Sequence, residues 1–229
     1  MRLFFSFILC ALVGLSPLSA ERTVRVLHYG APKDSNLLEA FLYGGLPEAI
    51  PVTLNRSNFS NQIPISAETE LLRVLPRLLI KDEVFPRDAP SIAIPTTWVD
   101  TLLIFFHDTT NSVMPIRIAK MNASAGVFNP GELYWINMSE VFVGGTVGAE
   151  ELRIAPQKTA IMKCPTEDRE CAVKLDFVVK GETSRRALIR QMWRVNKQTR
   201  QVVFILKKPA PQMASYYVLP IKDIPEIKK

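Results

Sequence analysis

Histidine is scarce in this chain of 229 residues, which contains only His28 and His107. Imidazole is a common metal ligand and general base, so its scarcity argues against most zinc centres and against hydrolases with a histidine base. Asp108 follows His107 directly, but neighbours on a strand point to opposite faces and make a poor catalytic pair. Residues 144–148 (GGTVG) lack the Lys-Ser/Thr ending of a phosphate-binding loop. The sequence therefore predicts no catalytic residue, no metal site and no cofactor.

Long apolar runs are missing beyond the first 20 residues. Those residues combine Arg2, an apolar run of thirteen residues and the small residues of SPLSA, which is the pattern of a cleaved signal peptide. The run is shorter than the roughly 20 residues that a membrane-spanning helix needs. We therefore predict a signal peptide at residues 1–20, cleaved after Ala20. The mature protein is expected to be exported, periplasmic or secreted, with no transmembrane segment.

Only three cysteines occur, and Cys10 lies within the predicted signal peptide. Cys164 and Cys171 enclose the polar loop 165–170 without a Cys-x-x-Cys motif or a second Cys/His pair nearby. In an exported chain, two such cysteines most simply pair with each other. We predict a disulfide that staples a hairpin, with free thiols as the alternative. Closing so short a loop contributes about 2–2.5 kcal/mol on the chain-entropy model.

Helical periodicity is weak, whereas short runs rich in β-branched and aromatic residues recur along the whole chain. Most of the seventeen prolines fall between these runs. Two segments, 67–83 and 185–195, also fit a helix, but Pro76 interrupts the first one. Alternation fits the second segment better and predicts a hairpin with the strand that comes after the turn at 196–200. The expected fold class is all-β.

Small and turn-forming residues at 122–131 (NASAGVFNPG) mark the best candidate domain boundary, with 81–90 as the alternative. The first choice leaves two parts of about 100 residues, each with enough strands for a sandwich. We predict two tandem β-sandwich-like (Ig-like) domains, at residues 21–122 and 123–229. The second domain carries the predicted hairpin disulfide. No strict internal repeat is visible in the sequence.

Acidic residues are absent from positions 183–221, a stretch that is rich in Lys and Arg. If this region alternates as a strand, Arg186, Arg190 and Arg194 share one face, and such a face attracts anions. The alternative is a solvated outer face on which the arginines protect a strand edge from aggregation. No motif resembles an intracellular nucleic-acid-binding module. The three arginines are the candidate anion-binding residues.

Aromatic pairs offer a weaker signal for sugar binding. Tyr134 and Trp135 are adjacent, as are Tyr216 and Tyr217, and Trp98 stands alone. Each pair straddles both faces of a strand, so one member is expected in the core. A stacking platform would require the outward members to converge.

Three segments, FNPGELYWINMS, ELRIAPQKTAIMKCP and MWRVNKQTRQVVFILKKP, resemble a group of uncharacterised exported bacterial proteins of the verrucomicrobial and planctomycete type. The similarity lies mainly within residues 98–208. The resemblance implies an all-β fold and a place in the cell envelope. It provides no catalytic residue.

The leading hypothesis is a non-enzymatic exported protein that acts as a binding or structural module of the bacterial cell envelope. Its partner would be another envelope protein, met through sheet edges. The second hypothesis is a binder of an anionic polymer or carbohydrate that uses the basic β-hairpin face. An envelope hydrolase ranks third, because it requires a pocket with converging polar groups.

Overall fold

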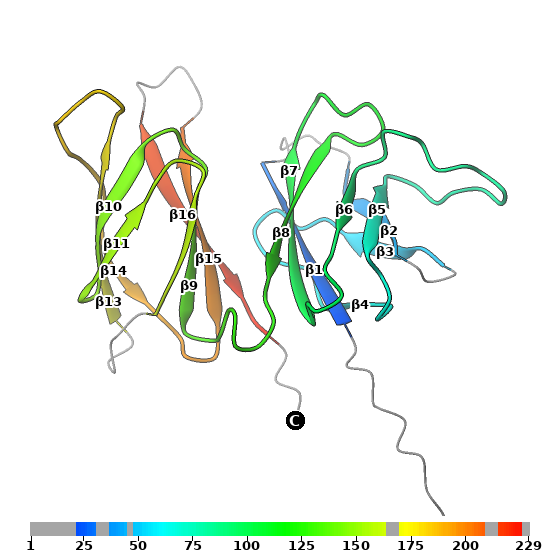
Figure 1. Ribbon diagram of the computed structural model, residues 1–229, viewed down its shortest axis with the longest axis horizontal. Coiled ribbons are helices and arrows are strands. Elements are labelled where there is room, and N and C mark those ends of the chain that lie inside the picture. Colours follow the sequence, from blue (N-terminus) through cyan, green and yellow to red (C-terminus); the bar gives the residue numbers. More distant parts are fainter. Residues whose placement is uncertain (1–21, 31–36, 45–47, 164–169, 209–214, 226–229) are drawn as a thin grey trace, which may run out of the picture.

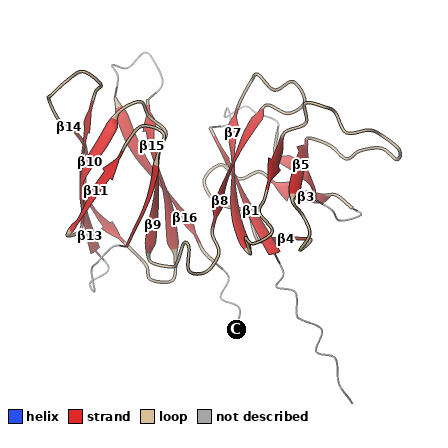
Figure 2. Ribbon diagram, in the orientation of Figure 1, coloured by secondary structure: helices blue, strands red, loops and turns tan. Residues whose placement is uncertain are grey.

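The computed structural model describes residues 22–30, 37–44, 48–163, 170–208 and 215–225. The predicted signal peptide at residues 1–20 lies outside them. The described residues form sixteen strands and no helix, which confirms the all-β fold class (Figure 1, Figure 2). In this part of the chain there is accordingly no helix that could span a membrane.

The strands up to residue 122 form a first β-sandwich. Its inner sheet has the order β4-β1-β7-β8, with bounds Ile63–Ile65, Arg22–Tyr29, Asp100–His107 and Ile116–Asn122. Its outer sheet has the order β3-β2-β5-β6, with bounds Ile50–Thr53, Glu39–Tyr43, Leu71–Leu75 and Ser91–Ala93. Buried apolar side chains such as Val26, Leu42 and Phe105 fill the space between the two sheets.

The strands from residue 132 onwards form a second β-sandwich. Its inner sheet has the order β12-β9-β15-β16, with bounds Thr159–Lys163, Glu132–Asn137, Arg200–Lys207 and Tyr216–Asp223. Its outer sheet has the order β11-β10-β13-β14, with bounds Glu150–Ile154, Phe142–Val147, Glu170–Val178 and Arg186–Arg194. The core between them includes Trp135 stacked on Trp193, with ring centroids 5.6 Å apart.

The two inner sheets pack against each other, so the molecule is a stack of four sheets (Figure 1). A third apolar layer lies between the inner sheets, where Leu27, Ile104 and Phe106 meet Val202 and Phe204. The central inner strands are therefore covered on both faces. This explains why β1, β7 and β15 are buried along nearly their whole length, whereas β13 on an outer sheet alternates between buried and exposed residues.

The two sandwiches share one topology. Adding eight to each strand number of the first sandwich gives the strand orders of the second, for both the inner and the outer sheet. In each half the first strand lies beside the seventh strand and runs parallel to it: β1 with β7, and β9 with β15. The fold is thus duplicated although the sequence shows no strict repeat.

Two local alternatives from the sequence are resolved. Segment 67–83 contains strand β5, which ends just before Pro76, and residues 186–194 form strand β14. The predicted hairpin between β14 and the next strand is wrong. Strand β14 pairs with β13, whereas β15 pairs with β9 and β16 in the other sheet. The apolar run of β15 is buried on both faces only in an inner sheet, so the turn at 196–200 crosses between sheets.

Candidate functional site

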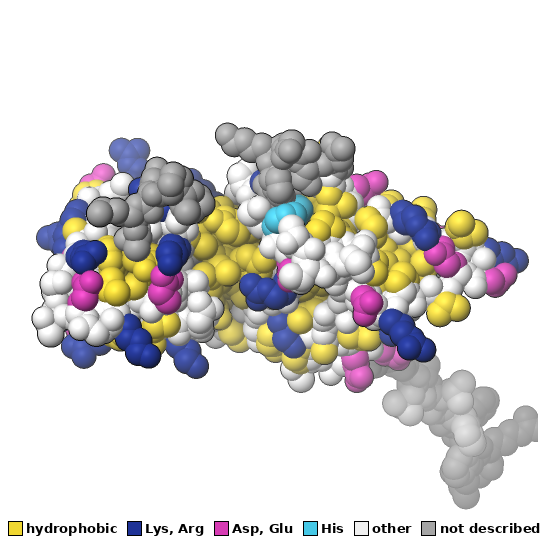
Figure 3. Space-filling view, turned by 90° about the horizontal axis from the view of Figure 1, so that it is seen from above, with side chains coloured by type: hydrophobic (Ala, Val, Ile, Leu, Met, Phe, Trp, Pro, Cys, Tyr) yellow, Lys and Arg dark blue, Asp and Glu magenta, His cyan; other side chains and the backbone are white. Residues whose placement is uncertain are grey.

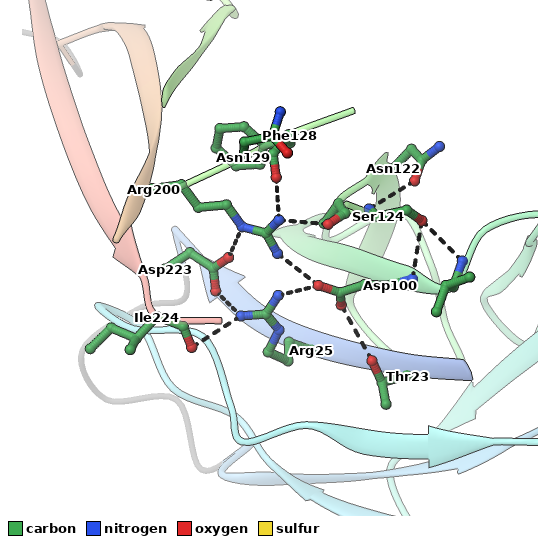
Figure 4. A network of polar contacts seen from close by, with 12 residues as sticks. Thr23, Arg25, Asp100, Asn122, Ser124, Phe128, Asn129, Arg200, Asp223 and Ile224 are labelled. Atoms are coloured by element: carbon green, nitrogen blue, oxygen red, sulfur yellow. Dashed lines mark hydrogen bonds and ion pairs between the residues drawn. The ribbon is translucent and has the colours of Figure 1, made fainter. Parts of the chain in front are cut away.

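A buried ring of four charged residues joins the two sandwiches (Figure 4). Arg25 of β1 donates to Asp100 of β7 at 2.6 Å and also to Asp223 of β16. Arg200 of β15 donates to the same two carboxylates, at 2.7 and 2.6 Å. Both arginine side chains are 3% exposed, Asp223 is 1% exposed and Asp100 is 16% exposed. The ring is neutral, and each carboxylate accepts hydrogen bonds from arginines of both sandwiches.

The same ring anchors the connection between the sandwiches. The Arg200 guanidinium also donates to the backbone carbonyls of Ala123 and Phe128, and its central carbon lies 4.9 Å from the Phe128 ring centroid. The Ser124 hydroxyl accepts hydrogen bonds from the backbone N–H groups of Val99 and Asp100. The predicted boundary segment 122–131 is therefore a connection that is tied to both halves.

Aromatic residues close the other end of the interface between the inner sheets. Tyr29 stacks on Phe204 at 5.4 Å, and its hydroxyl lies 2.9 Å from that of Tyr217. Phe106 meets Phe204 edge to face. Burial, together with the hydrogen bond to Tyr217, raises the pKa of Tyr29, so this phenol stays neutral. Charged residues at one end and aromatic residues at the other fix how the sandwiches face each other.

An apolar groove lies beside this interface, between strand β8 and strands β9 and β12. Its volume is about 180 Å³, and Phe106, Ala119, Tyr134, Ile136 and Met138 are among its lining residues. Seen from above, hydrophobic side chains form a strip between the two halves (Figure 3). We call this feature the interdomain groove. Its mix of apolar walls and a neighbouring strand edge suits an extended polypeptide better than a small polar substrate.

Each arginine of the predicted anion-binding face makes an ion pair. Arg186 pairs with Glu182 at 2.9 Å, Arg190 pairs with Asp176, and Arg194 lies 3.9 Å from Glu170. These pairs are partly exposed. Local carboxylates therefore offset the positive charge that the sequence suggested for this strand.

The three arginines also do not share one face, contrary to the expectation from alternation. Strand β14 has a bulge opposite Leu175 and Asp176, which leaves Leu188 without a register partner. As a result Arg186 stands opposite the core residue Phe177, whereas Arg190 stands opposite exposed Lys174. Directly opposite residues share a face. Arg190 and Arg194 thus lie on the outer face, and Arg186 does not.

A shallow depression lies on the outer face of the second sandwich. Its volume is about 450 Å³, and it is lined among others by Phe142, Gly144, Asp176 and Arg185. Gly144 leaves the floor without a side chain, and Phe142 is 42% exposed at its wall. Arg185 makes no ion pair within the described part of the chain, unlike Arg186, Arg190 and Arg194. The sequence alone does not single out Arg185.

The two histidines come close together at one end of the first sandwich. His28 is 1% exposed, and neither of its ring nitrogens has a hydrogen-bond partner among the described residues. Burial, followed by the charges of His107 and Arg56, lowers the pKa of His28 below its usual value of 6.5. No group of three or more potential metal ligands occurs in the described residues. His28 is therefore a neutral core side chain at neutral pH.

The remaining predicted residues fall in the core or outside the described residues. Cys171 is buried in β13, but Cys164 lies outside the described residues, so the disulfide stays a prediction. The hairpin expected around it is wrong, because β12 pairs with β9 in the inner sheet whereas β13 pairs with β10 and β14 in the outer sheet. Trp135 is fully buried and Tyr216 nearly so, whereas Tyr134 and Tyr217 line the layer between the sandwiches. The outward aromatic residues therefore do not converge on a sugar-stacking platform.

The fold and the groove define an all-β protein of two packed sandwiches. The chain matches no protein-family model, and among curated proteins no significant match is found.

Proposed function

We propose that this chain is an exported, non-enzymatic binding module of the bacterial cell envelope, and that its partner is another envelope protein. The observation that carries the proposal is the buried Arg25–Asp100–Arg200–Asp223 ring, which ties both sandwiches into one body. A fixed relative position of two sandwiches provides a composite surface that one sandwich alone lacks. The resemblance to exported bacterial proteins supports the location, and the scarcity of histidine supports a role without catalysis.

Cross-linking in the native host tests this proposal. A photo-reactive amino acid is placed at one of three exposed positions: Ile80 on the loop after β5, Phe142 on the outer sheet of the second sandwich, or Ile161 on β12. We expect a protein adduct that mass spectrometry identifies reproducibly from at least one position. Adducts with polysaccharide alone, or with no envelope protein from any position, would overturn the proposal.

A second candidate function rests on the depression with Arg185 at its wall. An exposed guanidinium, an exposed aromatic ring and a glycine floor suit an acidic polysaccharide chain lying across the sheet. Retention on an acidic-polymer column at increasing salt tests this function. The double substitution Arg190→Glu with Arg194→Glu, and the single substitution Arg185→Glu, should each abolish retention, whereas Lys81→Glu on the far sandwich should not. Retention that survives all the substitutions would exclude this function.

The predicted pairing of Cys164 with Cys171 belongs to the same proposal, because it fits an exported protein. Mass spectrometry of the unreduced mature protein after alkylation should show no modified cysteine, and reduction should add two modifications. Alkylation of both cysteines without reduction would show that they are free thiols. Reduction should lower the free energy of unfolding by about 2–2.5 kcal/mol.

A further inference from the structure

The two inner sheets are stacked with an offset of one strand. β1 faces β16 through the Arg25–Asp223 pair and the Tyr29–Tyr217 contact. β7 faces β15 through Phe106 and Phe204, and β8 faces β9 across the interdomain groove. Each inner sheet has four described strands, so one edge strand on each side has no described strand above it: β4 on one side and β12 on the other.

The two overhanging edges differ in how they are protected. β4 has only three residues, and its middle residue is the exposed Pro64, which cannot donate to a further strand. β12 instead presents Ile161, which is 41% exposed. Ile161 stands opposite Tyr134 in the register of β12 and β9, so both side chains point to the same face, the face toward the first sandwich. The apolar surface of the groove therefore continues over β12 without a covering strand among the described residues.

The edge next to this uncovered surface belongs to β8. It has seven residues without proline, all paired with β7 on one side, and no described strand pairs with its other side. Charged side chains often guard such edges. Here Lys120 turns back to donate to the Ala93 carbonyl at 2.6 Å, and the Arg117 guanidinium lies over the Phe106 ring at 5.1 Å. Both side chains are held on the first sandwich; β6 lies near β8 without pairing with it, so the backbone edge of β8 keeps no strand partner among the described residues.

We propose that the interdomain groove is the docking site for an extended segment of the partner protein, which pairs with the free edge of β8. The added strand becomes the fifth strand of the first inner sheet and lies over β12. Every second side chain of the added strand faces Tyr134 and Ile161. We therefore expect aliphatic residues at these alternate positions of the partner segment. Arg117, next to the groove, selects a partner segment with a carboxylate near one end. The inference rests on the proposed function and names the surface that carries it.

The structure provides a matched pair of positions for the test. Ile161 and Phe142 are both apolar strand residues, exposed to 41% and 42%, but Phe142 lies on the far outer sheet. The segment that cross-links to position 161 is identified and synthesised as a peptide. We expect Ile161→Arg to weaken peptide binding at least tenfold, and Phe142→Arg to leave it unchanged. Thr159→Arg, on the same face of β12, provides a second variant at the site.

Hydrogen exchange shows whether the peptide pairs as a strand. Bound peptide should slow exchange of backbone amides in residues 116–122 that are not already protected by β7, and should leave β4 unchanged. Adducts at positions 80 or 142 but not at 161 would overturn this inference while the proposed function stands. A cross-link at 161 to a second copy of this chain, or binding without protection of β8, would overturn it as well. No protein adduct at any position would overturn both.

Discussion

The inner and outer sheets of the two sandwiches diverge to different extents. The inner strands β1 and β7 have eight residues each, and their counterparts β9 and β15 have six and eight. The outer strands β5 and β6 have five and three residues, whereas their counterparts β13 and β14 have nine each. The inner sheets are covered on two faces and the outer sheets on one. The strands that are buried on both faces are therefore those whose lengths agree best between the two halves.

The outer sheets also differ in their connecting loops. In the first sandwich a long loop, residues 76–90, leads from β5 to β6 and projects away from the body (Figure 1). In the second sandwich the equivalent connection, between β13 and β14, is short and joins a long hairpin with a bulge. The shared inner frame thus fixes the relative position of the halves, while each outer face is free to acquire its own surface.

Removing one carboxylate from the buried ring should give the largest effect, because the ring joins the two inner sheets. Asp223→Ala leaves Arg25 and Arg200 without one of their two ion pairs in a buried position. We expect a loss of about 3–5 kcal/mol in the free energy of unfolding, measured by denaturant titration, because an uncompensated buried charge is costly. Glu151→Ala, which breaks the exposed pair with Arg153, should cost less than about 1 kcal/mol. Equal effects of the two substitutions would contradict the importance of the ring.

The apolar layer between the inner sheets should behave as a core of its own. Phe204 in this layer and Phe105 in the first sandwich core are both fully buried. Each substitution to alanine should cost about 3–5 kcal/mol. Because each inner sheet packs into the core of its own sandwich on one face and into the shared layer on the other, unfolding should show one transition by both tryptophan fluorescence and circular dichroism. Two separate transitions, or a Phe204→Ala effect well below that of Phe105→Ala, would mean that the sandwiches unfold independently.

A pair of adjacent glycines in the second outer sheet tests how closely its strands pack. Gly145 in β10 has a φ of 154°, and a Cβ there would lie 2.1 Å from the Lys174 carbonyl oxygen. Gly145→Ala should therefore destabilise the protein by about 2–3 kcal/mol. The neighbouring Gly144 has ordinary backbone angles, and a Cβ there would meet only the Phe142 ring closely, at 3.3 Å. Gly144→Ala should cost less than about 1 kcal/mol. Thermal unfolding of the two variants side by side measures the contrast.

The smallest expected effect is a pH dependence that belongs to the first sandwich. The pKa of His28 is lowered in the folded protein, so the unfolded chain binds more protons below about pH 6.5. The stability contributed by neutral His28 is complete above that pH and decreases as the pH falls below it. In His28→Leu the free energy of unfolding should change less between about pH 6.5 and 5 than in the wild type. An unchanged slope in this window would show that His28 is not the group responsible.

The strand content was predictable because the strongest apolar runs coincide with β7 and β15, which are buried on both faces. Strand pairing was not predictable in the same way. Residues 186–194 alternate as a strand should, but nothing local in the sequence states that β14 pairs with β13 rather than with the strand after it. The bulge that moves Arg186 off the outer face also has no local signal.

The candidate site was hidden for a related reason. Arg25 lies between the apolar residues Val24 and Val26 of β1, and this position was the local signal that pointed to a buried charge. Its partners Asp100 and Asp223 lie 75 and 198 residues further along the chain. The groove depends on the one-strand offset between two sheets, which is a property of packing and has no sequence pattern. A sequence pattern indicates which face of a strand is buried, but it does not indicate which other sheet packs against that face.

The parallel pairing of β1 with β7 has a consequence for the time course of folding. β1 must wait about 77 residues for its parallel partner β7, and β9 likewise waits for its parallel partner β15, whereas their antiparallel partners β4 and β12 lie nearer in the chain. Contacts between distant residues carry a large loop-closure entropy and slow the search for the native state. The Arg25–Asp223 contact spans nearly the whole described chain and can form only when the last strand is present. The inner sheets of a polypeptide of this design stay incomplete for longer than sheets built from local hairpins alone, a property that suits the export of an unfolded chain proposed above.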